Sequence, residues 1–414
     1  MQTQLADFIR DTPEGREAEE ILRKCVHCGF CTATCPTYQL LGDELDGPRG
    51  RIYLIKQVLE GAEPTEKTRL HLDRCLTCRS CESTCPSGVH YSRLLDIGRH
   101  VVDERVPRHG SDALTRRVLR EFVPRPTLFG AAMKAGQAVR GLLPKALKAK
   151  VPEARPAGAW PTARHARRVI ALAGCVQPAM APSINAAAAR VLDAIGISMV
   201  EAAGAGCCGA VRFHLNDQDG GRDDARRNID AWWPAIAAGE VEAIVMTASG
   251  CGVQVKDYGH MLKDDPDYAD KARRVAELTR DIGEVVAAEA DALAAALAAR
   301  ALPAQKLAWH APCTLQHGQR IRGTVEKLLA AAGYALTPVR DSHLCCGSAG
   351  TYSILQPELS ERLRGNKLDC LLEGGAGMIA SANIGCITHL QAGTGTPVRH
   401  WIELIDARLA GQPA

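Results

Sequence analysis

The sequence lacks the features of a secreted or membrane-spanning protein. Its first twenty residues carry acidic side chains and no apolar run, so we expect no signal peptide. The uncharged stretch 169–189 contains Pro178, Pro182 and Asn185 and does not predict a transmembrane helix. Aromatic residues make up only 4%, and the formal net charge of +3 is too small to indicate nucleic-acid binding. We therefore expect a cytoplasmic, alanine-rich protein, and 414 residues are enough for about two to four domains.

What the sequence has in excess is cysteine. The count of seventeen is odd, and the clustered spacing indicates metal sites in a reducing compartment rather than a disulfide framework. Eight of these cysteines form two copies of the pattern C-x2-C-x2-C-x3-C-P, at 25–36 and 75–86. This spacing is typical of a pair of 4Fe–4S clusters. Two zinc sites are the alternative, but zinc has no use for the third closely spaced thiol or for the proline.

The spacing also predicts which thiols share a cluster. Three thiolates two residues apart wrap one face of a cluster, while the fourth is turned away by the proline and binds the other cluster. The first predicted ligand set is Cys25, Cys28, Cys31 and Cys85. The second predicted ligand set is Cys75, Cys78, Cys81 and Cys35.

The first 125 residues show the periodicity of helices. Apolar residues repeat with a helical period in 52–59, between the two motifs, and helical patterning continues through 92–123. We therefore predict a mostly α-helical, two-cluster ferredoxin-like domain over residues 1–125. Arg49 and Arg51 either lie near the clusters, where they offset negative charge, or belong to a solvated helix start, and the sequence leaves both interpretations open.

A change of composition follows this domain. Residues 126–168 are rich in proline, alanine and basic side chains, and we predict a linker there. Its positive charge suits an anionic lipid surface, and a solvated linker is the alternative. Beyond it, β-rich apolar runs at 169–173, 243–247 and 378–381 alternate with alanine-rich helical stretches. That alternation predicts layers of helices and strands.

The second half of the chain contains an internal repeat of cysteines. The repeated positions are separated by 138, 138 and 135 residues in the pairs Cys175 with Cys313, 207–209 with 345–347, and Cys251 with Cys386. Three anchors in register predict a duplicated fold. We therefore expect two α/β cysteine-rich (CCG) repeats, over residues 169–300 and 301–414.

Four thiols gathered from separate loops of one repeat predict a metal site. An iron–sulfur cluster is the first expected occupant and zinc the second, while core cysteines or a disulfide at the Cys-Cys step are the alternatives without metal. Cys370, whose counterpart is Trp232, is predicted to be an ordinary buried cysteine. The predicted metal ligands are Cys175, Cys207, Cys208 and Cys251 in the first repeat, and Cys313, Cys345, Cys346 and Cys386 in the second.

No segment predicts a flavin or nicotinamide site. The segment 204–209 matches GxGxxG after a predicted strand at 197–201, but its variable positions hold the cysteines of the repeat. The second copy, at 345–350, lacks the pattern, and the sequence contains no P-loop. We therefore expect a carrier of single electrons that has no substrate-oxidising site of its own.

Several stretches resemble the iron–sulfur subunits of bacterial glycolate oxidases (glycolate dehydrogenases), and together they span nearly the whole chain. They include CVHCGFCTATCPTYQLLGDELDGPRGRIYLIKQVLEG, HLDRCLTCRSCESTCPSG, TASGCG, PCTLQH and DSHLCCGSAGTY. The cysteine-rich repeat is similar to that of heterodisulfide reductase, anaerobic glycerol-3-phosphate dehydrogenase and lactate-utilisation iron–sulfur subunits. In those relatives the last element is often CxxC, whereas Ala248 and Asn383 stand at the first position of that pair here.

The resemblance implies an electron-transfer subunit. Its partners would be FAD-binding subunits that oxidise glycolate to glyoxylate, and membrane quinone would be the final acceptor. Because quinone lies in lipid, no segment is predicted to span the membrane and residues 143–168 are basic, we also expect a peripheral position on the inner face of the cytoplasmic membrane. An equivalent subunit that serves lactate or glycerol-3-phosphate oxidation is the first alternative. A redox sensor is another, but two adjacent clusters and the lack of a helix-turn-helix motif disfavour it.

Overall fold

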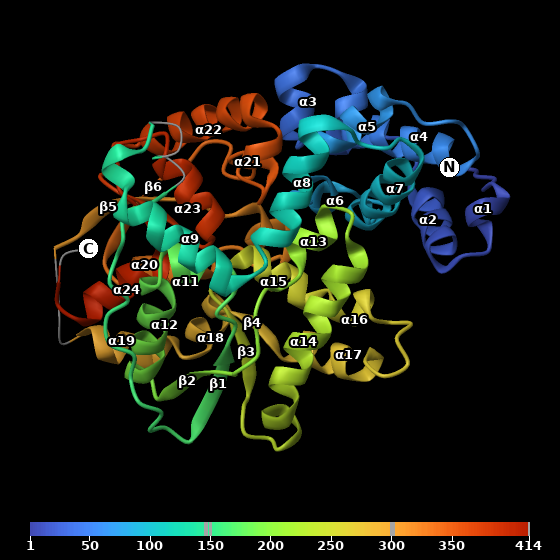
Figure 1. Ribbon diagram of the computed structural model, residues 1–414. Helices are drawn as coiled ribbons and strands as arrows, with labels where there is room; N and C mark the ends of the chain where they lie inside the picture. Colours follow the sequence, from blue (N-terminus) through green and yellow to red (C-terminus); the bar gives the residue numbers. More distant parts are fainter. Residues whose placement is uncertain (145–147, 149–150, 299–302, 413–414) are drawn as a thin grey trace.

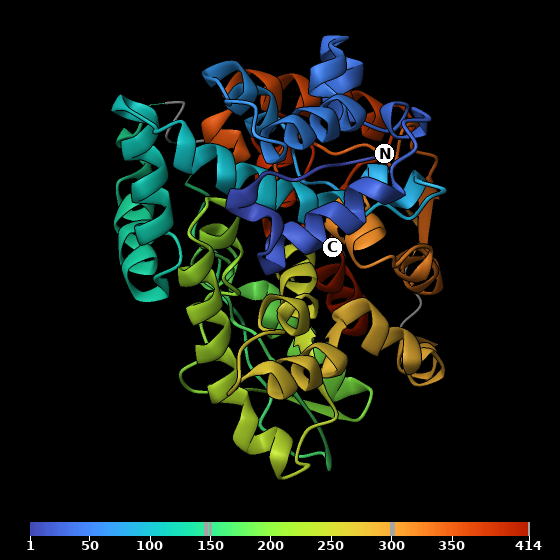
Figure 2. The ribbon, with the colours of Figure 1, turned by 90° about the vertical axis from the view of Figure 1, so that its right-hand side faces the viewer.

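The computed structural model describes residues 1–144, 148, 151–298 and 303–412. Three parts pack against one another, namely the blue N-terminal helices, the green-to-yellow first repeat and the orange-to-red second repeat (Figure 1). The view turned by 90° shows the N-terminal helices above the yellow helices of the first repeat (Figure 2). Arg79 pairs with Asp257 of the first repeat at 2.6 Å, and the Tyr352 hydroxyl of the second repeat donates to the Arg74 carbonyl at 3.2 Å. The N-terminal domain therefore contacts both repeats.

The N-terminal domain is helical, as predicted, and its described residues contain no strand. Prolines start two helices of this domain, because a helix tolerates proline in its first turn. Pro36 begins the helix after Cys35, and Pro48 begins the helix between the motifs. The elements are α1 (Asp7–Arg10), α2 (Pro13–Lys24), η1 (Phe30–Thr32), α3 (Pro36–Leu41), η2 (Glu44–Asp46), α4 (Pro48–Leu59), α5 (Glu66–Asp73), α6 (Ser80–Thr84), α7 (Tyr91–Arg105) and α8 (Gly110–Phe122).

Helices α4 and α7 cross closely in the core of this domain. Ile55 of α4 is fully buried against Gly98 of α7. A Cβ atom at Gly98 would lie 2.6 Å from the Ile55 side chain, so only glycine permits this approach. The close crossing holds α4 between the two cysteine motifs.

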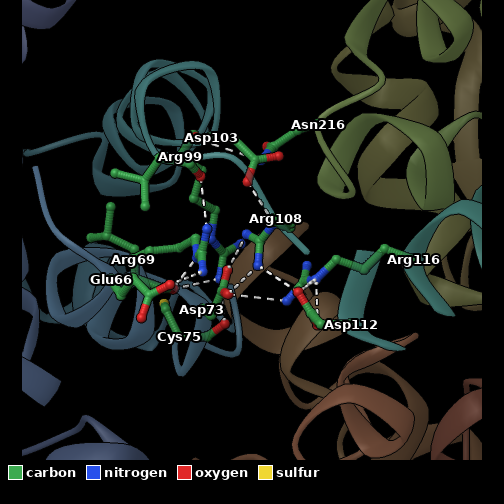
Figure 3. A network of polar contacts seen from close by, with 12 residues as sticks. Glu66, Arg69, Asp73, Cys75, Arg99, Asp103, Arg108, Asp112, Arg116 and Asn216 are labelled. Carbon is green, nitrogen blue, oxygen red and sulfur yellow. Dashed lines mark hydrogen bonds and ion pairs between the residues drawn. The ribbon is translucent and has the colours of Figure 1, made fainter. Parts of the chain in front are cut away.

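An ion-pair network joins α5 to α8. Arg108 donates to both carboxylate oxygens of Asp73, at 2.7 and 2.9 Å, and Arg116 reaches the same carboxylate at 3.1 Å (Figure 3). Burial alone would raise the pKa of Asp73, but the hydrogen bond from Arg108 and the charge of Arg116 lower it. The carboxylate therefore stays ionised and anchors α8 to the cluster domain.

The segment predicted to be a linker contains helical structure. It begins with helix α9 (Pro126–Ala138), which the short 3₁₀ helix η3 (Arg140–Leu142) follows. Met133 is buried, because apolar residues at helical spacing outweigh the proline and basic content of this stretch. Two further parts of the predicted linker, 145–147 and 149–150, lie outside the described residues.

The first repeat is built on a four-stranded parallel sheet with the strand order β2-β1-β3-β4, which confirms the predicted α/β layers. Its strands are β1 (Arg167–Ala171), β2 (Ile197–Glu201), β3 (Ala243–Met246) and β4 (Thr279–Asp281). Its helices are α11 (Gln177–Met180), α12 (Ser183–Ala194), α13 (Ala210–His214), α14 (Gln218–Ala237), α15 (Ser249–Lys256), α16 (Tyr258–Met261), α17 (Ala269–Leu278), α18 (Ile282–Ala288) and α19 (Ala290–Ala298).

The second repeat contains an equivalent parallel sheet, with the order β6-β5-β7-β8. Its strands are β5 (Gln305–Trp309), β6 (Tyr334–Thr337), β7 (Ile379–Ser381) and β8 (Val398–His400). Its helices are the π-helix η4 (Thr314–Gly318), α20 (Thr324–Ala331), α21 (Tyr352–Leu355), α22 (Pro357–Leu372), α23 (Ile384–Gln391) and α24 (Trp401–Leu409).

The two repeats share one hydrophobic core. Helix α12 of the first repeat packs against α24 of the second, and α18 of the first packs against α20 of the second. In the order of elements α12 corresponds to α20 and α18 to α24, so the two contacts are equivalent. Buried side chains from both repeats meet there, including Val191, Val285, Leu328 and Ile405. Two equivalent contacts of this kind are expected when two copies are related by an approximate twofold rotation.

Candidate functional site

The cysteines of the N-terminal domain surround two cavities. The cavity that we call the inner cavity is lined by Cys35, Cys75, Cys78 and Cys81. The cavity that we call the outer cavity is lined by Cys25, Cys28, Cys31 and Cys85, and Cys81 also borders it. Each therefore combines three cysteines of one motif with the fourth cysteine of the other, as the crossed arrangement requires. Four soft donors around each cavity fit an iron–sulfur cluster, and the ligation of iron itself stays a prediction.

The backbone of the two motifs is bent at equivalent residues. His27 and Thr77, each just before the second cysteine of its motif, have positive φ angles of 57° and 51°. Gly29 and Arg79, each just after that cysteine, have φ angles of 87° and 59°. These left-handed turns wrap the chain around its cavity. In the second motif the turn also brings the Thr77 N–H within 3.4 Å of Cys75 Sγ, where it stabilises negative charge on the sulfur.

The two cavities differ in their access to solvent. Cys28 at the outer cavity is exposed, and the adjacent Val26 and Phe30 are 68% and 62% exposed. At the inner cavity, burial raises the pKa of both Cys78 and Cys81. These thiols keep their protons without a metal and release them when one binds. The outer cavity therefore reaches the surface at Cys28, whereas each cysteine of the inner cavity is buried or half-buried.

Two arginines bring positive charge to the cavities. Arg49 borders the outer cavity and Arg51 borders the inner cavity. Arg51 is fully buried and donates to the His71 carbonyl at 2.6 Å and to Asp46 at 3.3 Å. Burial alone would lower the pKa of Arg51, but the neighbouring Cys75 and other acidic groups raise it, so the guanidinium stays charged. Of the two open interpretations, the structure favours arginines that lie beside the cluster cavities.

In the first repeat the cysteines gather at the carboxyl ends of parallel strands. Cys175 follows β1, Cys207 and Cys208 follow β2, and Cys251 lies in the first turn of α15, after β3. The strand order reverses between β1 and β3, and ligands bind to sheets of this type at such a point. Hydrogen-bonding contacts link each thiol to the next, and the contact with Cys207, together with burial, raises the pKa of Cys175.

The second repeat has the same arrangement. Cys313 Sγ lies 3.8 Å from Cys345 Sγ, and the thiols of Cys346 and Cys386 are in contact. The structure thus brings the four predicted thiols of each repeat together. Cys370 lies apart from them, buried in α22, and all cysteines are free thiols rather than disulfides. The occupant of each site stays a prediction.

Sequence reasoning missed one residue of the second site, His310. One of its ring nitrogens and the sulfurs of Cys346 and Cys386 all lie within 4.8 Å of one another, and the three residues are buried. Burial lowers the pKa of His310 to about 3, so its imidazole is neutral. The sequence contains a signal for it: in the register of the repeat, His310 corresponds to Leu172, so the two repeats differ in polarity at this position.

The N-terminal domain meets the second repeat next to the inner cavity. Leu76 and Cys78 pack in one apolar cluster with Cys313, Cys345 and Tyr352. The inner cavity and the cysteine site of the second repeat are therefore neighbours across this interface.

A separate cavity of about 390 Å³ opens at the same interface, between α6 and η4. The apolar side chains of Trp309 and Leu315 border it, together with the polar side chains of Arg322 and His343. Its volume suits a small organic molecule. Its lining includes Ser83 of α6, the helix that carries Cys81, and Leu315 of η4, the helix that follows Cys313.

The fold and the thiol-lined cavities define a class of protein. It is a protein of the iron–sulfur class, with a ferredoxin-like N-terminal domain and two cysteine-rich domains. Two family models agree with this description: the 4Fe-4S dicluster domain matches residues 21–89, and the cysteine-rich domain matches residues 169–256 and 307–391.

Proteins similar to this chain narrow the class. The glycolate oxidase iron-sulfur subunit of Escherichia coli (strain K12) is 58% identical over 410 residues, which cover 99% of both chains. A probable glycolate oxidase iron-sulfur subunit of Bacillus subtilis (strain 168) is 30% identical and covers 93% of this chain and 92% of its own. Lactate utilization protein A of an Exiguobacterium species is 26% identical over 52% of this chain and 85% of its own. The chain belongs to the family of glycolate oxidase iron–sulfur subunits.

One solved structure shares the fold over most of the chain. The crystal structure of a hypothetical protein from Helicobacter pylori aligns with a TM-score of 0.52 at 12% identity, and it covers 96% of this chain and 72% of its own. At this identity the likeness shows the fold alone. In the described part of this chain, no helix combines the length and the hydrophobicity needed to cross a bilayer.

Replacing one thiol of either cavity should remove iron. Cys25→Ser and Cys75→Ser each take one of four ligands from a cluster, so each variant should lose about four iron atoms per chain after anaerobic purification. Iron and acid-labile sulfide analysis measures the loss, and electron paramagnetic resonance shows which cluster signal disappears. Cys370→Ser is the matched control, because it removes a buried thiol that lines neither cavity and should leave the iron content unchanged. Full iron content in both cavity variants would contradict the crossed arrangement.

Proposed function

We propose that this chain is the electron-transfer subunit of a glycolate dehydrogenase complex. It takes electrons from FAD-binding subunits that oxidise glycolate to glyoxylate and passes them toward membrane quinone. It has no substrate-oxidising site of its own. The observation that carries the proposal is the pair of adjacent thiol-lined cavities, one of which has an exposed cysteine, in a chain that is 58% identical to a glycolate oxidase iron-sulfur subunit.

The positions of the cavities suggest a direction for the electrons. When bound, iron–sulfur clusters supply one-electron carriers. The exposed Cys28, with Val26 and Phe30 beside it, makes the outer cavity the side that a flavin subunit can approach. The inner cavity adjoins the second repeat and is thus the exit side. Arg49 and Arg51 offset the negative charge that thiolate ligands bring to the two cavities.

The quinone acceptor is proposed to bind in the cavity between α6 and η4. Trp309 and Leu315 offer an apolar surface for a quinone ring, while Arg322 and His343 offer donors for its carbonyl oxygens. Two electrons and two protons convert the quinone into a quinol: two one-electron deliveries across α6 supply the electrons, and the solvent supplies the protons. The cavity borders α6, which carries Cys81 of the inner cavity.

The alternatives are less well supported. A subunit for lactate oxidation would fit the same cavities, but the lactate-utilisation relatives match only about half of this chain, at 26% identity or below. Glycerol-3-phosphate oxidation rests only on the likeness of the cysteine-rich repeats. A redox sensor needs one labile centre, whereas this chain holds two adjacent cavities and two further thiol sites.

Loss of the inner cluster should interrupt the complex between flavin and quinone. In the assembled complex, Cys75→Ser should abolish glycolate-dependent quinone reduction, whereas glycolate should still bleach the flavin absorbance in the partner subunit. Stopped-flow absorbance and a quinone-reduction assay measure the two steps, and Cys370→Ser should leave both unchanged. Unimpaired quinone reduction in Cys75→Ser would refute the proposed relay, and flavin reduction by lactate but not by glycolate would favour the alternative complex.

The acceptor cavity is tested by two neighbouring arginines. Arg322→Gln should raise the KM for quinone roughly 10-fold, because a hydrogen bond from a charged group is lost. Its iron content and the rate of flavin reduction should stay as in the unaltered protein. Arg320→Gln is the control, since Arg320 is exposed and does not border the cavity. Equal KM values for both variants would place the acceptor elsewhere.

We also propose that the chain lies on the inner face of the cytoplasmic membrane as a peripheral protein. Its basic segment is less free to bind lipid than the sequence indicates, because Arg164 pairs with Asp193 at 2.7 Å and Arg167 with Glu242 at 2.9 Å. Partner subunits and the remaining basic residues would supply the attachment.

Membrane fractions should therefore release this chain without detergent. A wash with high salt or with carbonate should bring most of the protein into the supernatant, because screening weakens contacts between exposed charges. Quantitative immunoblots of the washed membranes measure the release. Extraction by detergent only would contradict a peripheral position, and so would full recovery of the intact complex in the soluble fraction at low salt.

A further inference from the structure

The two repeats differ at one pair of equivalent residues beside their cysteines. The backbone N–H of His310 donates to the Ala380 carbonyl at 2.8 Å, and the backbone N–H of Leu172 donates to the Val245 carbonyl at 3.2 Å. These bonds join equivalent strand ends, so an imidazole in the second repeat stands where the first repeat has an isobutyl group. The partner of His310 is also exchanged, since Ser381 of the second repeat corresponds to Met246 of the first. The second repeat thus has a polar pair, His310 and Ser381, at the two positions where the first repeat has an apolar pair, Leu172 and Met246.

The imidazole of His310 is oriented like that of a metal ligand. It is only 2% exposed, and its Nδ1 lies 2.9 Å from the Ser381 hydroxyl. Nε2 is the nitrogen that remains available to the sulfurs of Cys346 and Cys386. A histidine that binds a metal usually gives its other ring N–H to a neighbouring acceptor, which fixes the ring and the tautomer. Ser381 Oγ is such an acceptor.

We propose that the second repeat binds a single zinc ion through His310, Cys346, Cys386 and Cys345. Three thiolates and one imidazole form a common four-coordinate zinc site. Cys345 is the fourth ligand because its thiol contacts that of Cys346, and the Cys313 thiol donates a hydrogen bond to the Cys345 sulfur at 3.8 Å. Binding transfers three thiol protons to solvent and changes no oxidation state. The first repeat, which has Leu172 in place of the histidine, keeps a site of thiols alone.

The small size of the site favours one ion over a cluster. The cysteines of the N-terminal domain surround two cavities, and among the described residues no three of them bring their sulfurs within 4.8 Å of one another. A cluster of four irons needs that space between its thiols. In the second repeat the three donor atoms already lie within 4.8 Å of one another. That spacing suits ligands at about 2.0–2.3 Å from a shared ion.

The proposed ion has a structural role at the acceptor cavity. Cys313 ends the loop that precedes η4, and the residues of η4 border that cavity. A redox-inert ion next to this loop would hold the cavity wall in place without competing for electrons. The inference rests on metal binding by the repeats, and it does not depend on which substrate the flavin subunits oxidise.

Metal analysis of the full-length chain tests the proposal. Anaerobically purified protein, washed with a chelator, should contain about one zinc per chain in addition to its iron. His310→Leu, which introduces the residue found in the first repeat, should bind at least fivefold less zinc per chain and should keep its iron. His310→Cys should retain zinc, and its zinc X-ray absorption spectrum should change from three sulfurs and one nitrogen to four sulfurs.

Three results would overturn the proposal. They are an unaltered protein without zinc, a His310→Leu variant that retains its zinc, and a His310→Leu variant that loses iron instead, which would make His310 the ligand of a cluster. If His310→Leu does not fold, the absorption spectra of the unaltered protein and of His310→Cys decide the matter alone. Metal analysis does not depend on the assay of glycolate-dependent quinone reduction. Failure of this inference can therefore be distinguished from failure of the proposed function.

Discussion

The exchange of one cysteine between the two motifs is the constraint on which the N-terminal domain depends. Cys35 leaves its own motif to line the inner cavity, and Cys85 leaves its motif to line the outer cavity. The chain between the motifs must therefore run alongside both cavities, and α4 does so. Its first turns carry Arg49 to one cavity and Arg51 to the other. A buried guanidinium is costly without nearby negative charge, and Asp46 together with thiolate ligands provides that charge.

The cysteines of the repeats are placed by a different rule, the topology of a parallel sheet. Successive strands end at one edge, and the reversal of strand order between the first and third strands leaves a crevice there. Loops distant in the sequence deliver thiols to this crevice twice. The same twofold arrangement brings the two crevices together, since the Ser249 N–H donates to the Ala382 carbonyl at 3.0 Å and the Gly250 N–H to Asn383 Oδ1 at 3.3 Å.

The spacing of the cysteines along the chain was enough to predict how the thiols are grouped. The pattern of the two motifs predicted which thiols would share a cavity, and the register of the repeat predicted which thiols of each sheet would meet. Contacts between residues that are distant in the sequence could not be predicted from it. Helix α9 forms where composition predicted a linker, because composition does not report that Met133 is buried. His310 was missed because a lone histidine after a strand resembles a core residue until the packing brings Cys346 and Cys386 to it.

The position of the divergent site explains why the two copies differ. Only the second repeat places its cysteines against the inner cavity, where Cys313 and Cys345 pack with Leu76 and Cys78. On the proposed path, electrons that leave the inner cavity reach the acceptor sooner if the neighbouring site does not trap them. A site that holds an ion of fixed charge meets this condition, because it adds a constant electrostatic field and no redox state of its own. A histidine at the position that Leu172 occupies in the first repeat adds a nitrogen ligand for such an ion, and this histidine lies in the repeat that faces the proposed electron path.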